Sequence, residues 1–276
     1  MSPTLILIRK EIRDGLRNRW VLAVTLLLAM LALSLGFLGS APTGTVKVDP
    51  LTVTVVSLSS LSIFLIPLIA MLLSYDAIVG EIERGTMALL LSYPISRKQV
   101  MMGKFFGHLI ILALATVAGY GIAGIALQLA HGGLDLSAWT PFAMLILASI
   151  LLGACFLSLG YLISAIVKER ATAAGIAIGV WLFLVVIYDM MLLGILVADQ
   201  GRIITADLLN IILLFNPTDV YRLLNLTGHE NIALFSGMAG LSDQASLSSN
   251  TLLLVQILWI AIPLSLATLV FKRKSL

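Results

Sequence analysis

Charged residues are scarce in this sequence of 276 residues: Asp, Glu, Lys and Arg make up 11% of it, against about 25% in an average soluble domain. Hydrophobic residues make up 60%, more than the core of one globular domain of this length needs. They are gathered in blocks of about 20, the length that crosses the hydrocarbon layer of a bilayer as a helix. The scarcity of charge therefore excludes an ordinary soluble domain and predicts an integral membrane protein.

Cysteine and the common catalytic motifs are absent or nearly so. Cys155 is the one cysteine, so neither an intramolecular disulfide nor a CxxC metal or redox motif exists. The sequence contains no GxxxxGKS/T phosphate-binding loop, no HExxH zinc motif and no GxSxG nucleophile motif. We therefore expect a non-catalytic chain that binds no cofactor itself and makes no contact with nucleic acid. Cys155 is interpreted as a packed helix residue.

Six apolar blocks predict six transmembrane helices. They cover residues 20–39, 52–75, 105–128, 139–167, 171–197 and 251–271. The fourth and fifth blocks are separated only by Lys168, Glu169 and Arg170, and three adjacent charges predict a tight turn outside the hydrocarbon. The expected fold is an all-α integral membrane protein whose residues 1–276 form a single transmembrane domain.

The positive charges predict how the chain is oriented. With a cytoplasmic N-terminus, only three of the 17 Lys and Arg residues fall in outer segments, namely Lys47, Arg202 and Arg222. The positive-inside rule therefore places both termini in the cytoplasm and the chain in a bacterial inner membrane. The apolar block that begins at Trp20 is longer than that of a typical signal peptide, and Pro42 makes the stretch after it unsuitable as a cleavage site. We therefore expect a retained first span.

Residues 1–19 have the pattern of an amphipathic helix at the inner membrane surface. Apolar residues recur at steps of three and four and share one helical face: Leu5, Ile8, Ile12 and Leu16. Arginines form a stripe beside this face and continue to the end of the segment: Arg9, Arg13, Arg17 and Arg19. We expect the apolar face to lie among acyl chains and the arginines at anionic headgroups. A basic cluster that only sets the topology is the alternative.

Residues 76–104, between the second and third spans, form a predicted cytoplasmic coupling segment. Its acidic start at Glu81–Glu83 suits a helix N-terminus, and an apolar run from Met87 to Leu91 follows. Ser96 and Gln99 then have capping-box spacing for the next helix. A segment that only joined two spans would be short and polar. We therefore expect a helix of about ten residues that presents its apolar side chains to a partner, with packing under the bundle as the alternative.

Residues 198–250 are the predicted periplasmic segment. The apolar stretch Ile203–Phe215 is too short to span a bilayer, so it predicts an interfacial or packed helix. Asn216 and Pro217 have the pattern of an N-cap followed by a proline in the first helical position. A second short helix, beginning at Pro217, is therefore expected on this side.

Polar and metal-binding candidates lie near the outer end of the bundle. Asp189 is an ionisable residue inside the fifth span, which makes it a functional candidate, although a structural bond to a neighbour is the favoured interpretation. Residue types that suit copper are also present on this side: His131, His229, Met238, Met190 and Met191. Because they have no ligand spacing, we expect no metal site.

Two pairs of glycines have the spacing that lets helices approach closely. These are Gly103 with Gly107 and Gly175 with Gly179. The pattern predicts a packed bundle and permits a homodimer.

Three stretches of the coupling segment together resemble the signature of type-2 ABC permeases: Glu81–Thr86, Leu89–Arg97 and Gly103–Lys104. The resemblance implies six spans that follow an amphipathic elbow helix, here Arg9–Arg19, and a cytoplasmic coupling helix that docks into a separate ATPase. It also implies a homodimer that pairs with two ATPase subunits, and these partner chains would bind ATP and Mg. The docking residues would be Glu81, Glu83, Arg84, Gly85, Thr86, Met87, Leu89, Leu90 and Leu91.

Four further segments are similar to one subgroup of this family: Arg9–Glu11, Asp14–Trp20, Tyr75–Glu81 and Phe215–Asn225. The subgroup works with a cytoplasmic ATPase and a periplasmic protein in the assembly of the copper centres of nitrous-oxide reductase. The resemblance implies that the outer helix contacts that periplasmic protein through Asn216, Pro217, Asp219, Tyr221 and Arg222. The cargo stays open between a sulfur species, copper and mechanical work on the partner.

Two other functions are compatible with parts of this pattern. A general type-2 ABC exporter of a small molecule or lipid would share the elbow and the coupling segment. A stand-alone membrane scaffold or enzyme would need no ATPase, but the missing catalytic motifs argue against an enzyme.

Overall fold

The computed structural model of the chain describes residues 2–17, 19–38, 50–130, 136–199, 204–226 and 247–274. Over these residues the chain is helical and has no strand. Three of the residues whose types suit copper lie outside the described residues, namely His131, His229 and Met238. The predicted periplasmic segment, residues 198–250, is described only in part.

Each of the six predicted apolar blocks coincides with a long helix or a run of helices. These elements are α2 (Arg19–Leu38), α3 (Pro50–Ser74), α6 (Arg97–Ala130), α7 (Leu136–Ile166), the run α8 (Arg170–Leu182), η1 (Phe183–Ile187) and α9 (Tyr188–Asp199), and α14 (Ser249–Arg273). Five helices of the described part are long and apolar enough to cross a membrane, or six if the bent pair α1–α2 counts as one span. The chain is therefore a multi-pass membrane protein.

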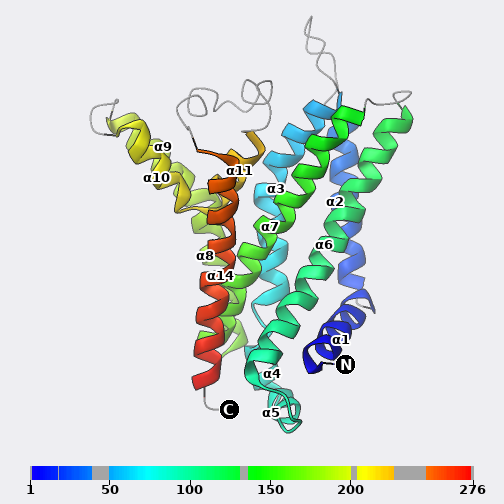
Figure 1. The fold of residues 1–276 in the computed structure, drawn as a ribbon, viewed down its shortest axis with the longest axis vertical. Helices are drawn as coiled ribbons and strands as arrows, with labels where there is room; N and C mark the ends of the chain where they lie inside the picture. The colour runs from blue at the N-terminus through cyan, green and yellow to red at the C-terminus, as the bar shows by residue number, and fades with distance from the viewer. Residues whose placement is uncertain are drawn as a thin grey trace, which may run out of the picture.

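The first helix, α1 (Pro3–Arg17), is a separate element that precedes the first long helix. It makes an angle of 66° with the stretch Val21–Phe37 and lies near the lower end of the bundle in Figure 1. The predicted amphipathic helix is thus present, and its position at a membrane surface stays a prediction.

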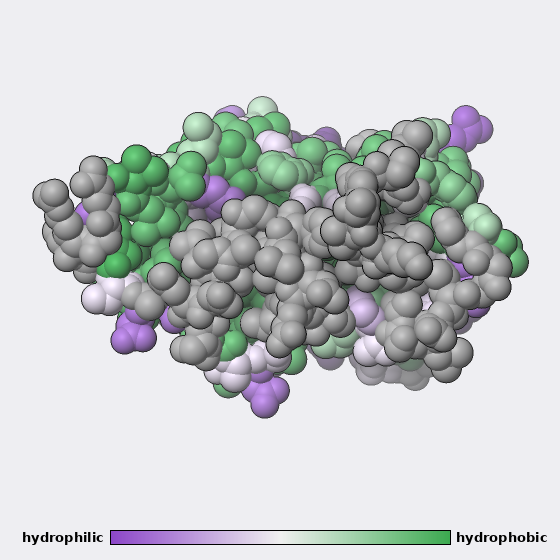
Figure 2. Space-filling view, turned by 90° about the horizontal axis from the view of Figure 1, so that it is seen from above, coloured by the Kyte–Doolittle hydropathy of each residue, from purple (hydrophilic) through white to green (hydrophobic). Residues whose placement is uncertain are grey.

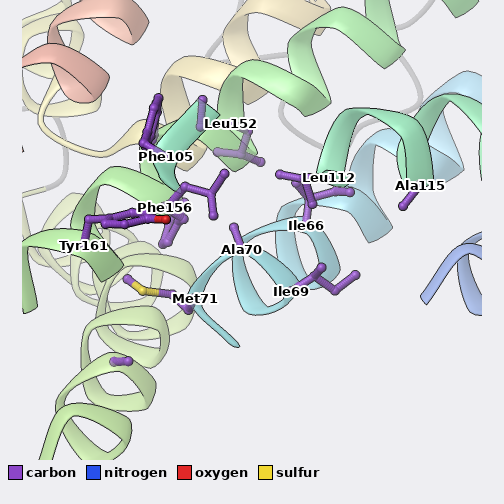
Figure 3. Close-up of a cluster of buried hydrophobic side chains, with 14 of the residues drawn as sticks. Ile66, Ile69, Ala70, Met71, Phe105, Leu112, Ala115, Leu152, Phe156 and Tyr161 are labelled. Atoms are coloured by element: carbon purple, nitrogen blue, oxygen red, sulfur yellow. The ribbon is translucent and has the colours of Figure 1, made fainter. Parts of the chain in front are cut away.

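The long helices form two groups that meet in a common core. Helices α3 and α14 pack along α7, and helices α1 and α2 pack along α6. In Figure 3, Ile66 and Met71 of α3 lie in one cluster with Phe105 of α6 and with Phe156 and Tyr161 of α7. Hydrophobic side chains cover much of the flanks visible in Figure 2, as expected for helices that face lipid.

The run α8–η1–α9 is the least enclosed span. Only 11% of its most apolar window is buried within the chain, against 61% for the span that contains α7. In Figure 1 it diverges from the other helices toward the upper left, beside α10 (Ala206–Leu214). Its lateral face is therefore available to lipid or to another chain.

The coupling segment is shorter and more broken than the sequence predicts. The single helix of about ten residues expected there is instead two helices, α4 (Val79–Glu83) and α5 (Thr86–Leu91). They are separated at Gly85, whose φ of 71° lies in the left-handed region that favours glycine. The predicted length is therefore wrong, because the chain turns sharply at Gly85.

Candidate functional site

The coupling segment forms the lower tip of the molecule in Figure 1, where α4 and α5 lie side by side. Leu89 is 67% exposed and Tyr93 is 62% exposed, so the tip presents two large apolar side chains. Arg84 and Thr86 are also exposed. The tip is therefore a small surface that combines apolar and polar groups.

Met87 departs from the predicted docking face. Its side chain is completely buried in the core of the bundle, and Leu90 and Leu91 pack against the same core while half-buried. One side of the apolar helix α5 packs against the bundle, whereas Leu89 faces outward. The expectation that Met87 is presented to a partner is wrong for this reason.

The start of the next helix is fixed by the predicted capping box. The backbone N–H of Gln99 donates to Oγ of Ser96 at 3.2 Å, and the backbone N–H of Ser96 donates to Oε1 of Gln99 at 2.9 Å. Next to it, Arg97 donates to the carbonyl oxygens of Phe271 and Lys274 at the C-terminal end of α14. The exit of the coupling segment is therefore rigidly attached to the bundle.

Helix α4 is held at its beginning by α7 and at its end by α8. Oγ of Ser164 accepts the backbone N–H groups of Ile78 and Val79 at 3.0 and 3.1 Å. The carboxylate of Glu83 accepts the backbone N–H of Arg170 at 2.6 Å, at the N-terminus of α8, where a negative charge is favourable. The Arg170 side chain in turn pairs with Asp76 at 2.9 Å.

A buried cation joins the coupling segment to α1. Nζ of Lys104, on α6, lies 2.6 Å from Oε1 of Glu81 and 3.1 Å from Oε1 of Glu11. His108 lies one turn further along α6, 3.6 Å from the other oxygen of Glu11, and its Nδ1 is 2.7 Å from the hydroxyl of Tyr161. This series of polar contacts therefore connects α4, α6, α1 and α7.

Burial alone would raise the pKa of the Glu11 carboxyl, but the adjacent His108 ring and the Lys104 ammonium hold it well below its ordinary value. Glu11 is therefore charged, and the buried cluster contains a carboxylate on each side of the lysine. Sequence reasoning missed Lys104, His108 and Glu11, although a lysine and a histidine four positions apart at the cytoplasmic end of a span were a usable signal.

The outer end contains a second polar network, built around α11 (Pro217–Leu226). Asn216 caps this helix as predicted, because its Oδ1 accepts the backbone N–H of Thr218 at 3.1 Å. Its Nδ2 donates to the carbonyl oxygen of Leu184 at 2.9 Å, and the Thr218 hydroxyl donates to the same carbonyl. Leu184 lies in η1, a π-helical turn, so both donors bond to the irregular part of the fifth span.

Arg222 connects α11 to α9. Its guanidinium lies 2.6 Å from the carboxylate of Asp189 and 2.6 Å from that of Asp219. Burial raises the pKa of Asp219 to about 7, with Arg222 acting in the opposite direction and Asp189 in the same direction. Asp189 is therefore paired with Arg222, which lies on the outer hairpin formed by α10 and α11.

Two side chains of the spans bond to the end of α10. The Tyr188 hydroxyl donates to the carbonyl oxygen of Ile212, and Nε1 of Trp259 donates to that of Leu214, at 2.6 and 3.1 Å. Both carbonyls lie at the C-terminal end of α10, and that of Ile212 also accepts the backbone N–H of Phe215. Four predicted partner residues are buried by this arrangement: Asn216, Pro217, Asp219 and Tyr221.

Candidate metal ligands do not gather anywhere in the described ranges. No group of three or more His, Cys, Asp or Glu residues there has the geometry to hold a metal ion. Met190 and Met191 are exposed on the lateral face of α9. Cys155 is completely buried between α7 and α14, where its thiol donates to the carbonyl oxygen of Gln256.

Comparison with known proteins gives a consistent result over the whole chain. The family described as "ABC-2 family transporter protein" matches residues 5–276. A protein of Stutzerimonas stutzeri named "Probable ABC transporter permease protein NosY" is 44% identical over 275 residues, which cover 99% of each chain. A protein of the same name from Pseudomonas aeruginosa is 45% identical over 269 residues, which cover 97% of each chain.

Both relatives are named as permeases, the non-catalytic membrane components of ABC transporters. The matched stretches cover 97% or more of this chain, so they include the helical bundle and the coupling segment. The chain belongs to the ABC-2 family of transporter proteins and is similar over nearly its whole length to permeases named NosY.

Proposed function

We propose that the chain is the membrane subunit of an ATP-driven complex in which two copies pair with two cytoplasmic ATPase subunits and with a periplasmic protein. The complex would couple ATP hydrolysis to work on the periplasmic side during assembly of the copper centres of nitrous-oxide reductase. The ATPase would be of the NosF type and the periplasmic protein of the NosD type. The observation that carries this proposal is the firmly anchored tip at α4 and α5, which presents apolar side chains on the side of the bundle where α1 lies.

The tip is suited to receive a mechanical input. Its exposed face is small and contains Leu89, Tyr93 and Arg84, so a complementary groove on an ATPase would bury apolar area around a charged group. The remainder of the segment is fixed to α6, α7, α8 and α14 by side-chain bonds. A displacement of the tip would therefore act on the spans through these bonds.

The exposed face of α8 and α9 supports the homodimer. Large apolar side chains line it, and a Cβ added at Gly175 or Gly179 would meet no atom of the described residues within 4 Å. Small residues at such spacing let a helix of a second copy approach closely. Helix α9 is bonded to α11 through Asp189 and Arg222, so this seam would lie next to the outer hairpin.

The orientation follows from the same proposal. The tip, α1 and the C-terminal end of α14 lie at one end of the bundle, and α10 and α11 lie toward the other. With the tip in the cytoplasm of a bacterial inner membrane, α11 and the outer segment face the periplasm. Arg222 is partly exposed there, whereas the other predicted partner residues of α11 act by shaping the hairpin.

The test is to isolate the tagged chain from native membranes in mild detergent and to identify what accompanies it. A P-loop ATPase together with a periplasmic protein supports the three-part complex, whereas the ATPase alone favours a general exporter. If neither protein accompanies the chain, docking at the tip is contradicted and a stand-alone scaffold is favoured.

A substitution at the tip makes this test specific. Leu89→Asp places a charge where the groove would bury an apolar group, so we expect loss of the ATPase from the isolated complex. Leu89→Met keeps the apolar contact and serves as the matched control. Leu90 is a poorer probe, because it packs against the core and its replacement would disturb the fold.

A further inference from the structure

Helix α4 carries two carboxylates that bond to different parts of the bundle. Glu81 binds Lys104 of α6, and through it α1, whereas Glu83 binds the backbone N–H at the N-terminus of α8. A displacement of the coupling segment cannot preserve both attachments if α6 and α8 move apart. The relative strengths of the two attachments therefore decide which part of the bundle follows the tip.

The attachment through Lys104 is the stronger one. The side chains of Lys104, Glu81 and Glu11 are only 4%, 13% and 10% exposed. Removing Glu81 from this site would leave a buried lysine with one partner fewer, and separating buried charges is costly.

Close packing reinforces this side of the segment. A Cβ at Gly103 would lie 2.7 Å from Cβ of Leu7, and one at Gly107 would lie 2.5 Å from Cβ of Glu11. Helix α1 is therefore in direct contact with α6 along the turn that carries Lys104.

The attachment to α8 is the weaker one. Glu83 is exposed, and the side chains of the neighbouring Arg170–Asp76 pair are 42% and 26% exposed. Water can replace these bonds at little cost. Ser164 of α7 bonds only the backbone N–H groups at the start of α4, so it does not hold the end of this helix, where Glu83 lies.

We propose that the coupling segment, α1 and the beginning of α6 form one moving body joined by Lys104, and that this body separates from the N-terminus of α8 when the ATPase changes its nucleotide state. The inference rests on the proposed docking of an ATPase at the tip. Lys104 is then a positioning residue that determines which helices are displaced together with the coupling segment. Helices α8 and α9 do not follow this displacement.

The experiment measures two distances by spin labelling in the reconstituted complex with its ATPase. Two double-cysteine variants carry the labels at exposed residues, one at Arg13 on α1 and Ser92 after α5, the other at Ser92 and Ala171 on α8. The protein without these cysteines controls for the buried Cys155. Between the nucleotide-free state and the state trapped with ATP and vanadate, the distance from 92 to 171 should shift. The distance from 13 to 92 should stay the same.

Variants identify Lys104 as the cause. In Lys104→Met, or in the milder Glu81→Gln if that protein does not fold, the distance from 13 to 92 should broaden or change with nucleotide. Lys104→Arg should retain the behaviour of the parent protein, and Glu83→Gln should leave this distance constant.

Two kinds of failure are distinguishable. A shift between 13 and 92, or a constant distance between 92 and 171, overturns the inference while the ATPase remains bound. An ATPase that does not bind the parent protein overturns the proposed function, and the inference with it.

Discussion

Asn216 donates a hydrogen bond from Nδ2 to the carbonyl oxygen of Leu184 across 2.9 Å, and this bond joins the outer hairpin to the π-helical turn of the fifth span. The same side chain caps α11 through its Oδ1. One buried amide therefore fixes both the start of a helix and an irregular turn in its neighbour. Irregular backbone inside a span persists only where such donors satisfy it.

Replacing Asn216 with alanine removes both functions at once. We expect Asn216→Ala to lower the free energy of unfolding by about 1–3 kcal/mol, because it leaves a buried carbonyl with one donor fewer and removes the cap. Thermal unfolding in detergent measures the effect. Asn225→Ala is the control, since Asn225 is only partly buried and bonds within its own helix. Equal melting temperatures for the two variants would contradict the role of Asn216.

The sequence predicted those features that depend on residues close together in the chain. The capping box of Ser96 and Gln99 and the start of α11 at Asn216 are set by local spacing, and both are present as predicted. The apolar blocks likewise predicted the long helices, because a helix that faces lipid must be apolar over its full length. Local chemistry was therefore sufficient for the fold class.

The features that the sequence did not reveal depend on distant residues. Glu11 and Lys104 are 93 positions apart, and the sequence around neither residue indicates that their side chains meet. The π-helical turn at Phe183–Ile187 has no local signal either, since its donors come from Asn216 and Thr218. Met87 was misassigned because a run of apolar residues does not indicate which side of a short helix faces inward.

The pH dependence of stability should reveal Asp219. Burial raises its pKa to about 7 in the folded chain, whereas an unfolded aspartate has a pKa near 4. The folded chain therefore holds this proton more tightly, so the contribution of Asp219 to stability falls as the pH rises from about 4 to about 7 and is constant above that.

Melting temperatures of the parent protein and of Asp219→Asn across this range provide the measurement. The amide cannot ionise, so the variant should gain stability relative to the parent as the pH increases. The difference excludes contributions from other groups, including Glu11, whose depressed pKa acts only at lower pH. A difference that does not vary with pH would show that Asp219 does not titrate in this window.

Removing the buried lysine should be more damaging than removing its exposed neighbour. Lys104→Met removes the buried cation between Glu11 and Glu81, so we expect a loss of about 3–5 kcal/mol in the free energy of unfolding. Lys10→Met is the control, because Lys10 also contacts Glu11 but is half-exposed, and its loss should cost less than about 1 kcal/mol.

A triple variant separates charge from packing in this cluster. Glu11→Gln and Glu81→Gln, added to Lys104→Met, remove the unpaired charges and should restore most of the lost stability. Denaturant unfolding of the purified chain gives the comparison. If the triple variant is no more stable than Lys104→Met, the loss came from packing and the cluster does not act electrostatically.

The two glycine pairs should respond in opposite ways to larger side chains. Alanine at Gly107 would place its Cβ 2.5 Å from Cβ of Glu11, so α1 must move away, and we expect a loss of about 1–3 kcal/mol in stability. In the described part of the chain no atom lies within 4 Å of a Cβ built at Gly175, so Gly175→Leu should leave the unfolding of the monomer unchanged. If α8 forms the seam between two copies, the same substitution should reduce the fraction of dimer seen in native mass spectrometry. A Gly175→Leu chain that remains fully dimeric would place the seam on another face.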